Sequence, residues 1–491
     1  MDWTRKRGTE TGAAVAGQRP GARDQGQGTS GAASLAAAPG PSRQPVAAEA
    51  VTRVPAGIAQ GRFWTLEHTD PDQASLHLSG LLRFVGTGWQ PERIAANIVR
   101  LIEEQPSLRT VFEETDGELW QLVLPTMAPP FQVVQLRAPS DASEERMAEA
   151  VETARRLADE PFDLRRGPLF RVAMLVVDPD EFFLLVTLHH LISDGYSISL
   201  VGHAAMLGTS GPLQYTYLDH AERQRATLAA GGYAKEVEHW RELLRDAPPV
   251  TTFPPARPRP ATWRPEGTVL TDRVDPEVTR RVHALAARSR RSPGAIMVAC
   301  YLIVLAGWSG QRDVVTATVT LGRSAPGSDK AIGVFRNFAP LRWSGAGEGR
   351  FTDVLEHAQR ALYDAADNSE MPIAALTAAL EPDPPTDRSP VFQTLINLLM
   401  VDDEDYCLPP PRRLTSCTLD MILHVEKWFG TYYLNWMYPR SLFDADSVAE
   451  FNATFQTVLR QAVATPDIPT ERLLTLVREA AHDSRAKAPR S

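Results

Sequence analysis

The chain has 491 residues, of which 43% are hydrophobic and 23% charged, and its net charge is −9. These values are ordinary for a globular protein that buries a sizeable core. The negative balance gives no general attraction for nucleic acid or for an anionic membrane, so neither is expected as a partner.

The cysteines and the apolar segments of the sequence indicate the cellular compartment in which the protein is expected. Cys300, Cys407 and Cys417 show no C-x-x-C spacing, which predicts neither a disulfide framework nor a zinc site and fits a reducing cytoplasm. The longest apolar run, residues 295–308, is shorter than the ~20 residues that cross a bilayer and predicts a buried helix. Basic residues 5–7 are not followed by the apolar segment of a signal peptide. We therefore expect a cytoplasmic protein without a metal site.

Composition divides the chain into four parts. Residues 1–52 are rich in Gly, Ala, Gln, Pro and Ser and predict a disordered tail, because such a segment buries too little surface to offset its ordering entropy. Residues 53–246 carry mixed helix and strand signals and predict an N-terminal lobe. The Pro-rich residues 247–267 predict a stiff linker. Residues 268–485 predict a C-terminal lobe.

The N-terminal lobe shows both periodicities. Apolar residues recur at helical spacing after Pro91, which predicts a helix. Residues 169–177 and 182–190 are β-rich and separated by a short Asp-Pro-Asp turn, which predicts a hairpin. A helix is expected after Asp194, and residues 233–245 predict an amphipathic helix.

The C-terminal lobe alternates in the same way. Helices are predicted around residues 278–285, 295–308 and 449–463. Strands are predicted at residues 314–321, 395–400, 421–426 and 432–437. The mixture in both halves predicts an α/β or α+β fold with two lobes of similar size.

The segment that carries chemistry is residues 188–195, Leu-His-His-Leu-Ile-Ser-Asp-Gly. Strand alternation turns His189 and His190 toward opposite faces, so one can face a cleft while the other is held inside the lobe. A histidine at a strand end suits a general base, because a pKa near 6.5 leaves it mostly neutral at pH 7. Asp194 can fix the turn through a buried ion pair with an arginine. Gly195 can present a backbone N–H to a developing oxyanion.

Other interpretations of the histidine pair stay open. Both side chains can be structural, or they can belong to a metal site. No cysteine or further histidine lies at ligand spacing, which disfavours the metal. Spacing alone leaves acyl transfer as one hypothesis beside a structural role.

The segment resembles the H-H-x-x-x-D-G signature of the condensation domains of nonribosomal peptide synthetases. Their superfamily includes chloramphenicol acetyltransferase and some lipid acyltransferases. Further segments resemble the motifs of this family, in the family's order, between about residue 57 and residue 467. They are residues 59–64 (AQGRFW), 108–112 (LRTVF), 161–164 (PFDL), 167–171 (GPLFR), 217–219 (YLD), 239–244 (HWRELL), 322–323 (GR), 332–337 (IGVFRN), 368–372 (NSEMP), 387–390 (DRSP) and 442–444 (LFD).

Four positions depart from the family's pattern. Gly57 stands where the family usually has Ser, and Gln105 where it usually has His. His220 replaces an aromatic residue, and Arg336 occupies a position that is commonly apolar. We expect these residues to line the substrate tunnel or to end helices, away from the catalytic turn, and so to alter substrate preference more than activity.

The resemblance implies two lobes like those of chloramphenicol acetyltransferase, arranged as a V with a central tunnel. His190 matches the histidine at the tunnel centre, as a base or as the group that orients the nucleophile. His189 matches the structural histidine. Asp194 would pair with an arginine, for which Arg323 is the candidate, and both would support the site. Gly195 would contribute backbone at the reacting carbonyl.

Three more residues are candidates for contact with the tunnel or the substrate. Tyr196 and Ser197 stand at a helix start, where ordinary packing is an equal alternative. Asn337 ends the I-G-x-F-x-N motif, and satisfying a buried loop is the favoured interpretation. Arg323 also has an alternative, as a solvated arginine at a strand end.

The resemblance implies a free-standing condensation enzyme, since the chain has no room for adenylation or carrier domains beside two lobes. It would join an acyl or aminoacyl thioester, held on the phosphopantetheine arm of a carrier protein, to an amine or an alcohol. We expect a monomer that binds no cofactor of its own. Several arginines could attract an acidic carrier protein, although a solvated face is the favoured explanation. They are Arg257, Arg259, Arg288, Arg290 and Arg291.

Two other functions stay open. An acyl-CoA-dependent acyltransferase of the same superfamily would share the His and Asp but lack the late motifs at residues 368–372 and 387–390. A non-catalytic domain that recruits a carrier or a tailoring enzyme tends to lose the histidine pair, which is present here. An epimerase relative would carry an E-G-H-G-R-E-like motif, which this sequence lacks.

Overall fold

The computed structural model describes residues 51–69, 76–86, 88–137, 143–209, 211–260, 266–380, 387–399, 406–407, 417–428 and 430–487. Ala50–Ser491 form one compact unit. Most of the predicted tail, residues 1–50, lies outside the described residues. Thr52, its last residue, already begins strand β1 (Thr52–Pro55).

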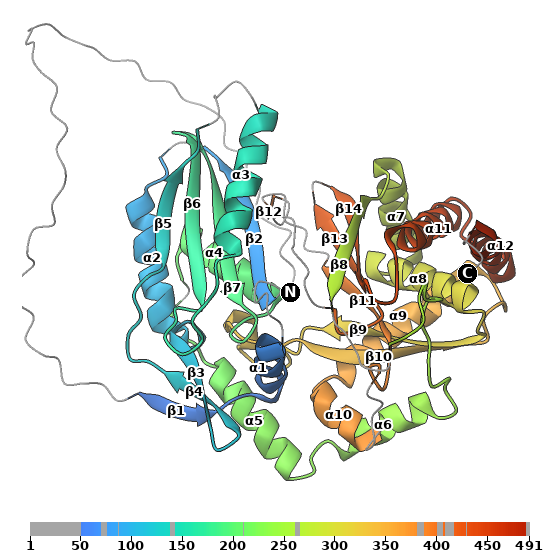
Figure 1. Cartoon of the computed structure of the whole chain (residues 1–491), viewed down its shortest axis with the longest axis horizontal. Coiled ribbons are helices and arrows are strands. Elements are labelled where there is room, and N and C mark those ends of the chain that lie inside the picture. The colour runs from blue at the N-terminus through green and yellow to red at the C-terminus, as the bar shows by residue number, and fades with distance from the viewer. Residues whose placement is uncertain are drawn as a thin grey trace, which may run out of the picture. The chain divides into compact units, whose positions relative to one another are not determined.

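A five-stranded sheet carries the histidine pair (Figure 1). Its strand order is β12-β2-β7-β6-β5, and the neighbours are antiparallel except for the parallel pair β5 and β6. The strands are β2 (His77–Val85), β5 (Phe131–Gln135), β6 (Phe170–Asp178), β7 (Glu181–His189) and β12 (Tyr406–Cys407). Strands β6 and β7 are the predicted hairpin, which is confirmed. Strand β12 comes from late in the chain, so C-terminal residues complete this sheet.

Helices cover both faces of the five-stranded sheet. Along β7, Leu184 and Val186 are buried in one core with helices α2 and α4, and Phe183 and Leu185 in another with α3. These helices are α2 (Pro91–Glu104), α3 (Ser143–Ala158) and α4 (Gly195–Leu207). The alternation predicted for this strand is confirmed, and so are the helices predicted after Pro91 and Asp194.

A small three-stranded antiparallel sheet, β1-β4-β3, lies in the same half of the chain. Its other strands are β3 (Thr110–Thr115) and β4 (Glu118–Val123). The helices of the chain up to residue 246 that have not yet been named are α1 (Ile58–Thr69), α5 (Tyr217–Ala229) and α6 (Ala234–Leu244). Gly57 precedes α1, and a Cβ there would lie 2.4 Å from the hydroxyl of Tyr217. The serine usual in the family would need Tyr217 to move, so packing against α5 explains this departure.

A six-stranded sheet forms the other half, in the order β10-β9-β11-β13-β14-β8. Strand β11 is parallel to β9 and to β13, and the other neighbours are antiparallel. The strands are β8 (Gly267–Arg273), β9 (Asp313–Thr320), β10 (Asn337–Ser344), β11 (Thr394–Leu399), β13 (Met421–Trp428) and β14 (Thr431–Pro439). All four strands predicted for this half are present, although Met400 lies outside the described residues.

Helix α8 (Pro293–Ser309) is the centre of the C-terminal core. All its residues from Gly294 to Trp308 are buried, so the predicted buried helix is confirmed. In the described part of the chain no single helix is long and apolar enough to cross a bilayer; α7 (Pro276–Ser289) and α8 pass such a test only together, across a bend of 108°. The remaining helices are α9 (Phe351–Asp367), α10 (Ile373–Leu380), α11 (Ala445–Ala464) and α12 (Thr470–Lys487).

The Pro-rich stretch after residue 246 packs on the C-terminal core. Phe253 is fully buried among three aromatic side chains. The backbone N–H of Thr251 donates to the side-chain oxygen of Gln393 at 2.8 Å. This part of the predicted linker is therefore anchored, and Gly267, its last residue, begins β8. Residues 261–265 lie outside the described residues.

The connection from β9 to β10 leaves its own sheet. Ile332 and Phe335 are buried in the core beneath the five-stranded sheet. The Gln105 side chain donates to the carbonyl of Lys330 and accepts from the N–H of Ile332, each at 2.9 Å. Gln105 follows the last residue of α2, so this departure lies at a helix end as expected and clamps the crossing connection.

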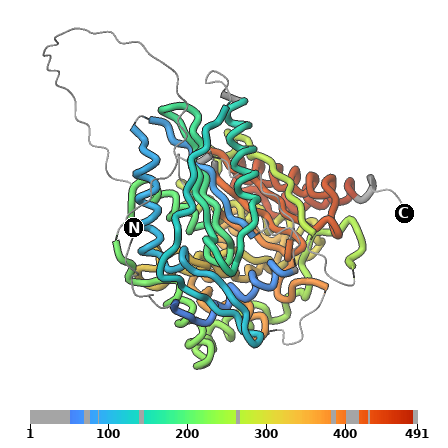
Figure 2. The backbone as a smooth tube through the Cα atoms, turned by 60° about the vertical axis from the view of Figure 1, so that its left-hand side comes forward, coloured from blue at the N-terminus to red at the C-terminus, as the bar shows by residue number. Residues whose placement is uncertain are grey.

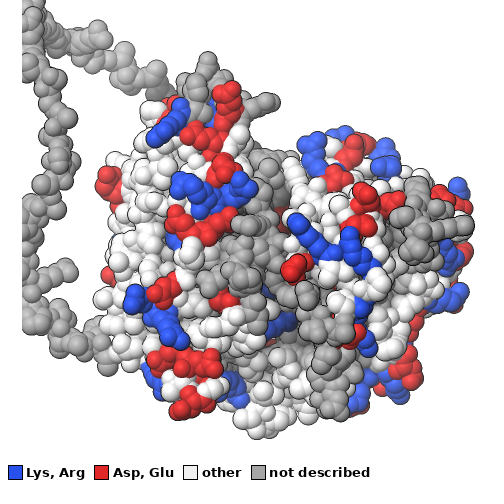
Figure 3. All heavy atoms as spheres, in the orientation of Figure 1, with Lys and Arg blue, Asp and Glu red and all other residues white. Residues whose placement is uncertain are grey.

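Figure 2 shows the two halves after a turn of 60°, with the blue-to-green elements in front of the orange-to-red ones. Acidic and basic side chains are interspersed over the face in Figure 3. Of the arginines considered for carrier attraction, Arg257 donates to the carbonyls of Arg440 and Phe443, and Arg259 forms an ion pair with the buried Asp420. These two arginines are tied into the fold.

Candidate active site

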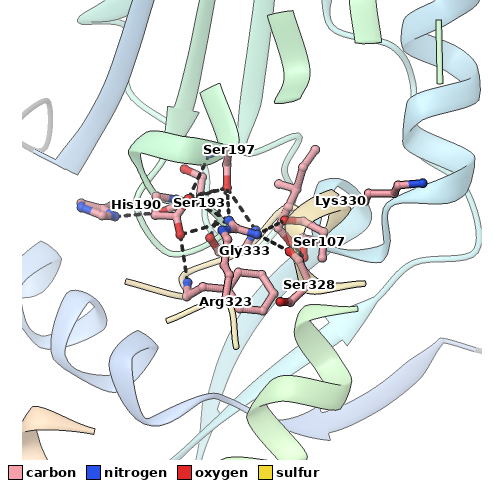
Figure 4. A network of polar contacts seen from close by, with 12 residues as sticks. Ser107, His190, Ser193, Ser197, Arg323, Ser328, Lys330 and Gly333 are labelled. Atoms are coloured by element: carbon pink, nitrogen blue, oxygen red, sulfur yellow. Dashed lines mark hydrogen bonds and ion pairs between the residues drawn. The ribbon is translucent and has the colours of Figure 1, made fainter. Parts of the chain in front are cut away.

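His190 lies immediately after β7, with its ring fixed by the turn that follows. Nδ1 donates to the carbonyl of Ser193 at 2.8 Å, and the backbone N–H donates to the carbonyl of Leu76 at 2.8 Å (Figure 4). A neutral imidazole that donates through Nδ1 keeps its lone pair on Nε2. Within the described residues no hydrogen bond uses Nε2 of His190. The turn therefore selects the tautomer in which Nε2 can accept a proton.

The surroundings of His190 keep it neutral. Its ring stacks on Phe63 of α1, with centroids 4.1 Å apart and planes inclined by 17°. Burial, followed by the positive charge of Arg336, lowers the pKa of His190 well below its ordinary value of 6.5. The uncharged form therefore dominates at neutral pH, where it can accept a hydrogen bond.

His189 points to the other face and uses both ring nitrogens internally. Its Nδ1 accepts from the backbone N–H of Leu191 at 3.1 Å, and its Nε2 lies 3.2 Å from a carboxylate oxygen of Glu67. Glu67 and Phe63 are four residues apart on α1, so one face of this helix contacts both histidines. These contacts fit the structural role that the resemblance implies for His189.

Asp194 caps α4 and gathers donors from both halves of the chain. Its carboxylate accepts from the N–H and hydroxyl of Ser197, at 3.0 and 2.8 Å, and from the N–H of Phe335 at 3.1 Å. Nη2 of Arg323 lies 3.0 and 3.1 Å from its two oxygens (Figure 4). The expected ion pair is thus present, and its side chains are 3% and 5% exposed.

Arg323 is locked by more than its carboxylate partner. Nη1 donates to the carbonyls of Ser328 and Ala331, each at 2.6 Å. The guanidinium lies over the rings of Phe335 and Tyr196, 4.2 and 4.5 Å from their centroids. The alternative of a solvated arginine is therefore wrong.

Gly195 and its two successors begin α4. The first N–H groups of a helix have no partner within it, so the Gly195 N–H is available at the positive end of the helix dipole. A Cβ on Gly195 would lie 3.6 Å from Leu399, which places this helix start against β11 of the other half. Tyr196 is 36% exposed. Ser197 is fully buried in the helix cap and also bonds Gly333, so its position fits support better than substrate contact.

Asn337 is taken up by a loop. Its side-chain nitrogen donates to the carbonyls of Ser369 and Met371 at 2.8 and 2.5 Å, and its oxygen accepts from the N–H of Ile373 at 3.0 Å. Both ends of the amide are engaged, which fits the loop interpretation and leaves little capacity for a substrate.

Two of the departures lie closer to the catalytic turn than the sequence suggested. The guanidinium carbon of Arg336 is 5.5 Å from the centre of Phe63, the ring stacked on His190. His220 is buried against Phe335, with ring centroids 4.7 Å apart. The connection between β9 and β10 folds back beneath the turn, so each of these residues lies one aromatic side chain away from it, and their place along the tunnel stays a prediction.

Sequence reasoning also missed the residues that hold the histidines. Phe63 and Glu67 approach from α1, and the side-chain nitrogen of Gln60 donates to the carbonyl of Leu191 at 2.8 Å. Gln60 and Phe63 stand inside the matched AQGRFW motif, which was the available signal. Glu67 gave none beyond its spacing of four from Phe63.

The described residues were searched for metal ligands and for reactive thiols, and neither kind of site is present among them. No cluster of three or more His, Cys, Asp or Glu side chains there is arranged to hold a metal ion. Cys300 and Cys417 are buried free thiols, and burial raises the pKa of both, to about 12 for Cys417.

Solved structures identify the fold. The condensation domain of the monacolin K polyketide synthase MokA superposes with a TM-score of 0.73 at 18% identity, over 86% of this chain and 100% of that one. SgcC5 from Streptomyces globisporus gives 0.72 at 20% identity, over 85% and 100%. The X-domain from teicoplanin biosynthesis, solved with OxyB, gives 0.66 at 21% identity, over 88% and 98%. The mixed α/β fold of the chloramphenicol acetyltransferase type is confirmed.

Family membership follows from the sequence comparison. Residues 51–483 match the family model of the condensation domain, and the chain belongs to this family. Phosphinothricin tripeptide synthetase PhsC of Streptomyces viridochromogenes is 30% identical over 475 residues, which cover 92% of this chain and 43% of that protein. Tyrocidine synthase 3 of Brevibacillus parabrevis is 30% identical over 389 residues, 78% of this chain and 6% of that protein. The chain thus spans less than half of these relatives, whose domains of this family support amide bond formation in peptide natural-product biosynthesis.

Proposed function

We propose that the chain is a condensation enzyme of natural-product biosynthesis. It joins an acyl or aminoacyl group, delivered as a thioester on the phosphopantetheine arm of a carrier protein, to an amine or an alcohol. An amide is the default product and an ester the alternative. The observation that carries this proposal is the fixed Nδ1 tautomer of His190, whose Nε2 is left as an acceptor beside the start of α4.

In the proposed reaction the nucleophile donates a hydrogen bond to Nε2 of His190 and its N or O attacks the thioester carbonyl. The carbonyl becomes an oxyanion, for which the Gly195 N–H at the positive end of α4 is a suitable donor. The adduct then collapses, the C–S bond breaks, and the proton passes through His190 to the departing thiolate. The products are the amide or ester and the free phosphopantetheine thiol.

The depressed pKa of His190 refines its proposed role. A weak base gains little by removing a proton from a free amine, yet it orients the lone pair of that amine well. Once the nitrogen has attacked, it carries a positive charge and is far more acidic. We therefore propose that His190 positions the nucleophile first and accepts its proton only in the tetrahedral adduct.

Asp194 and Arg323 act as positioning residues in this proposal. Their ion pair ties the helix start that presents Gly195 to the connection between β9 and β10. This tie spans the two halves of the chain. We propose that these halves form two lobes, residues 53–246 and 268–485, with the substrate tunnel between them. Gly195 and His190 would then lie where both substrates meet. We extend the proposal to a cytoplasmic protein that acts as a monomer and as a separate polypeptide. The native mass of the isolated protein tests the monomer.

The test is a condensation assay with a panel of acylated carrier proteins and free amines or alcohols, read by mass spectrometry of the product. We expect His190→Ala to lower the rate of product formation by about 10²- to 10⁴-fold, the usual contribution of a positioned proton-transfer group. The carrier and the amine alone give the uncatalysed rate.

The matched control is His482→Ala, because His482 is exposed on α12. It should keep the rate of the wild-type chain. Product formation by His190→Ala at the wild-type rate would remove His190 from the mechanism. A wild-type chain that binds the acylated carrier but forms no product with any acceptor would favour a recruitment role.

A further inference from the structure

The carboxylate of Glu67 is buried beside the histidine pair, and the proposed mechanism does not use it. Glu67 lies in the last turn of α1, and its side chain is 3% exposed. A carboxylate is unfavourable there on two counts, because burial removes its water and the C-terminal end of a helix carries negative partial charge. A side chain that conflicts with its local surroundings in this way points to a role beyond packing.

His189 is the hydrogen-bond partner that the fold provides for this carboxylate. Nε2 of His189 lies 3.2 Å from Oε2 of Glu67, and within the described residues no other hydrogen bond uses the Glu67 side chain. Nδ1 of His189 accepts from the backbone N–H of Leu191, so the ring hydrogen is on Nε2 and is donated to Glu67. The other tautomer, and the imidazolium, would set a second N–H against that of Leu191. The carboxylate therefore stabilises the one form of His189 that can accept from the turn.

The other contacts of the His189 ring are aromatic. The rings of His77 and Phe162 meet it edge-on, with centroids 5.9 and 6.0 Å away. Nδ1 of His77 is itself hydrogen-bonded to the carbonyl of Ala158 at 2.7 Å, and burial lowers the pKa of His77 to about 4, so it is neutral at pH 7. Within the part of the chain that the structure describes, Glu67 is therefore the one acceptor for the ring hydrogen of His189.

His189 in turn holds the three residues that follow His190. Its ring accepts from the N–H of Leu191 at 3.1 Å, and its carbonyl accepts from the N–H of Ile192 at 3.1 Å and from the hydroxyl of Ser193 at 2.9 Å. The carbonyl of Ser193 accepts the Nδ1 hydrogen of His190 at 2.8 Å. Three hydrogen bonds and the short backbone between residues 191 and 193 thus connect the α1 carboxylate to the imidazole of His190.

We propose that Glu67 is a positioning residue for His190. Its carboxylate fixes the ring of His189, and His189 holds the turn in the geometry in which the Ser193 carbonyl selects the Nδ1 tautomer of His190. This rests on the proposed function, in which Nε2 of His190 meets the nucleophile. Phe63, four residues earlier on α1, stacks on His190, so one helix sets the plane of that ring and, through His189, its tautomer.

The first test needs no substrate. ¹⁵N NMR of the histidine side chains reports which ring nitrogen carries hydrogen, with His190→Ala to assign the signals of His190. Glu67→Met, which has a similar volume but no acceptor, should mix the two tautomers of His190. Glu67→Gln, whose amide oxygen can still accept from His189, should keep most of the wild-type pattern. Glu479→Met, at an exposed position of α12, is the matched control and should leave the pattern unchanged.

The second test uses the condensation assay and separates kcat from KM. Glu67→Met should lower kcat by about 10- to 100-fold, the size expected when a reacting group is displaced by up to about 1 Å. KM should stay within about twofold of the wild-type value, because the interaction is used in the transition state and not in substrate binding. Glu67→Gln should retain most of the wild-type kcat.

A double substitution distinguishes positioning from simple support of the fold. Glu67→Met alone leaves a buried N–H of His189 without an acceptor, which also lowers stability. Adding His189→Phe removes both polar side chains, and apolar replacement of a buried pair commonly restores stability. The unfolding free energy should then recover in part while kcat stays low, because the N–H of Leu191 still has no acceptor.

Two results would overturn this role of Glu67. One is the wild-type tautomer of His190 in Glu67→Met, and the other is a double variant that recovers both stability and kcat. Should Glu67→Met yield no folded protein, the double variant carries the same comparison of tautomer and rate. If Glu67→Met mixes the tautomers but the wild-type chain forms no condensation product, the proposed function is refuted and the hold of Glu67 on His190 stands.

Discussion

Arg323 and Arg336 stand at the two ends of the connection between β9 and β10, yet their surroundings differ. Arg323 is 5% exposed, faces both oxygens of Asp194 and donates to two carbonyls. Arg336 is half-buried and lies against Phe63 and Phe338. The first guanidinium faces a buried carboxylate, and the second lies over two aromatic rings.

This difference separates an arginine that ties two chain segments through a carboxylate from one that packs on aromatic rings. A buried ion pair with several further hydrogen bonds holds two chain segments together, and breaking it strands a charge. A guanidinium over aromatic rings gains from the ring contact and has its plane held by it. The same residue type thus has two roles on one connection, and the three substitutions below test that division.

The largest effect is expected at the Arg323 end. Asp194→Ala leaves the Arg323 guanidinium buried without its carboxylate and removes the cap of α4. We expect a loss of about 3–5 kcal/mol of unfolding free energy and a lower yield of soluble protein. Chemical denaturation measures it, with Asp467→Ala as the control, since the exposed pair of Asp467 with Arg350 contributes less than about 1 kcal/mol. If Asp194→Ala were as stable as the wild-type chain, the ion pair of Asp194 with Arg323 would not contribute to stability.

A pH-dependent effect of intermediate size is expected at His220, which lies beside the same arginine. Burial first, then the charges of Arg223 and Arg323, lower the pKa of His220 to about 4. Between pH ~6.5 and ~4 the unfolded chain binds a proton that the folded chain does not, so stability falls as the pH drops.

His220→Phe removes that proton uptake. Nδ1 of His220 has no hydrogen-bond partner among the described residues, so the substitution should cost little at pH 7. At pH 4.5 it should be more stable than wild type by about 2 kcal/mol, measured by denaturation at both pH values. An identical pH dependence of stability in the two proteins would show that folding does not lower the pKa of His220. His482→Phe, at an exposed position, is the control.

The smallest effect on stability is expected at the Arg336 end. Arg336→Met should change the unfolding free energy by about 1 kcal/mol, less than Asp194→Ala, because Arg336 is only half-buried whereas Asp194 is buried. It should raise the pKa of His190, because a nearby positive charge that disfavours the imidazolium is lost, while burial still keeps this pKa below 6.5.

Two measurements check this last substitution. A ¹³C NMR titration follows the imidazole directly, with His190→Ala to assign the signal. In the condensation assay the fall in rate at acid pH should move to higher pH, because the neutral ring is needed and protonates sooner. An unmoved titration would show that Arg336 does not act on His190. A large loss of unfolding free energy in Arg336→Met would show that Arg336 supports the fold as Arg323 does.

Much of the site followed from local patterns. The period of two along β7 placed His189 and His190 on opposite faces, and the Asp-Gly after the turn began α4 as expected. These features depend on neighbours in the chain, which the sequence displays directly. The buried helix α8 was equally plain, because an apolar run of that length without charges has few other environments.

The environment of His190 could not be predicted in the same way. Arg336 was expected away from the turn, and Phe63 and Glu67 were not singled out, because their contacts join residues more than a hundred positions apart. Contacts of that kind depend on where the connection between β9 and β10 crosses into the other half. No periodicity marks such a crossing.

The sequence by itself therefore determined the elements, the fold class and the turn that fixes His190, since each depends on residue spacing and matched motifs. The tertiary structure decided which charges surround that turn. It paired Arg323 with Asp194 in a buried network and set Arg336 on the aromatic face next to His190. The physical reason is that electrostatic roles depend on burial and distance, and both arise only when distant segments pack together.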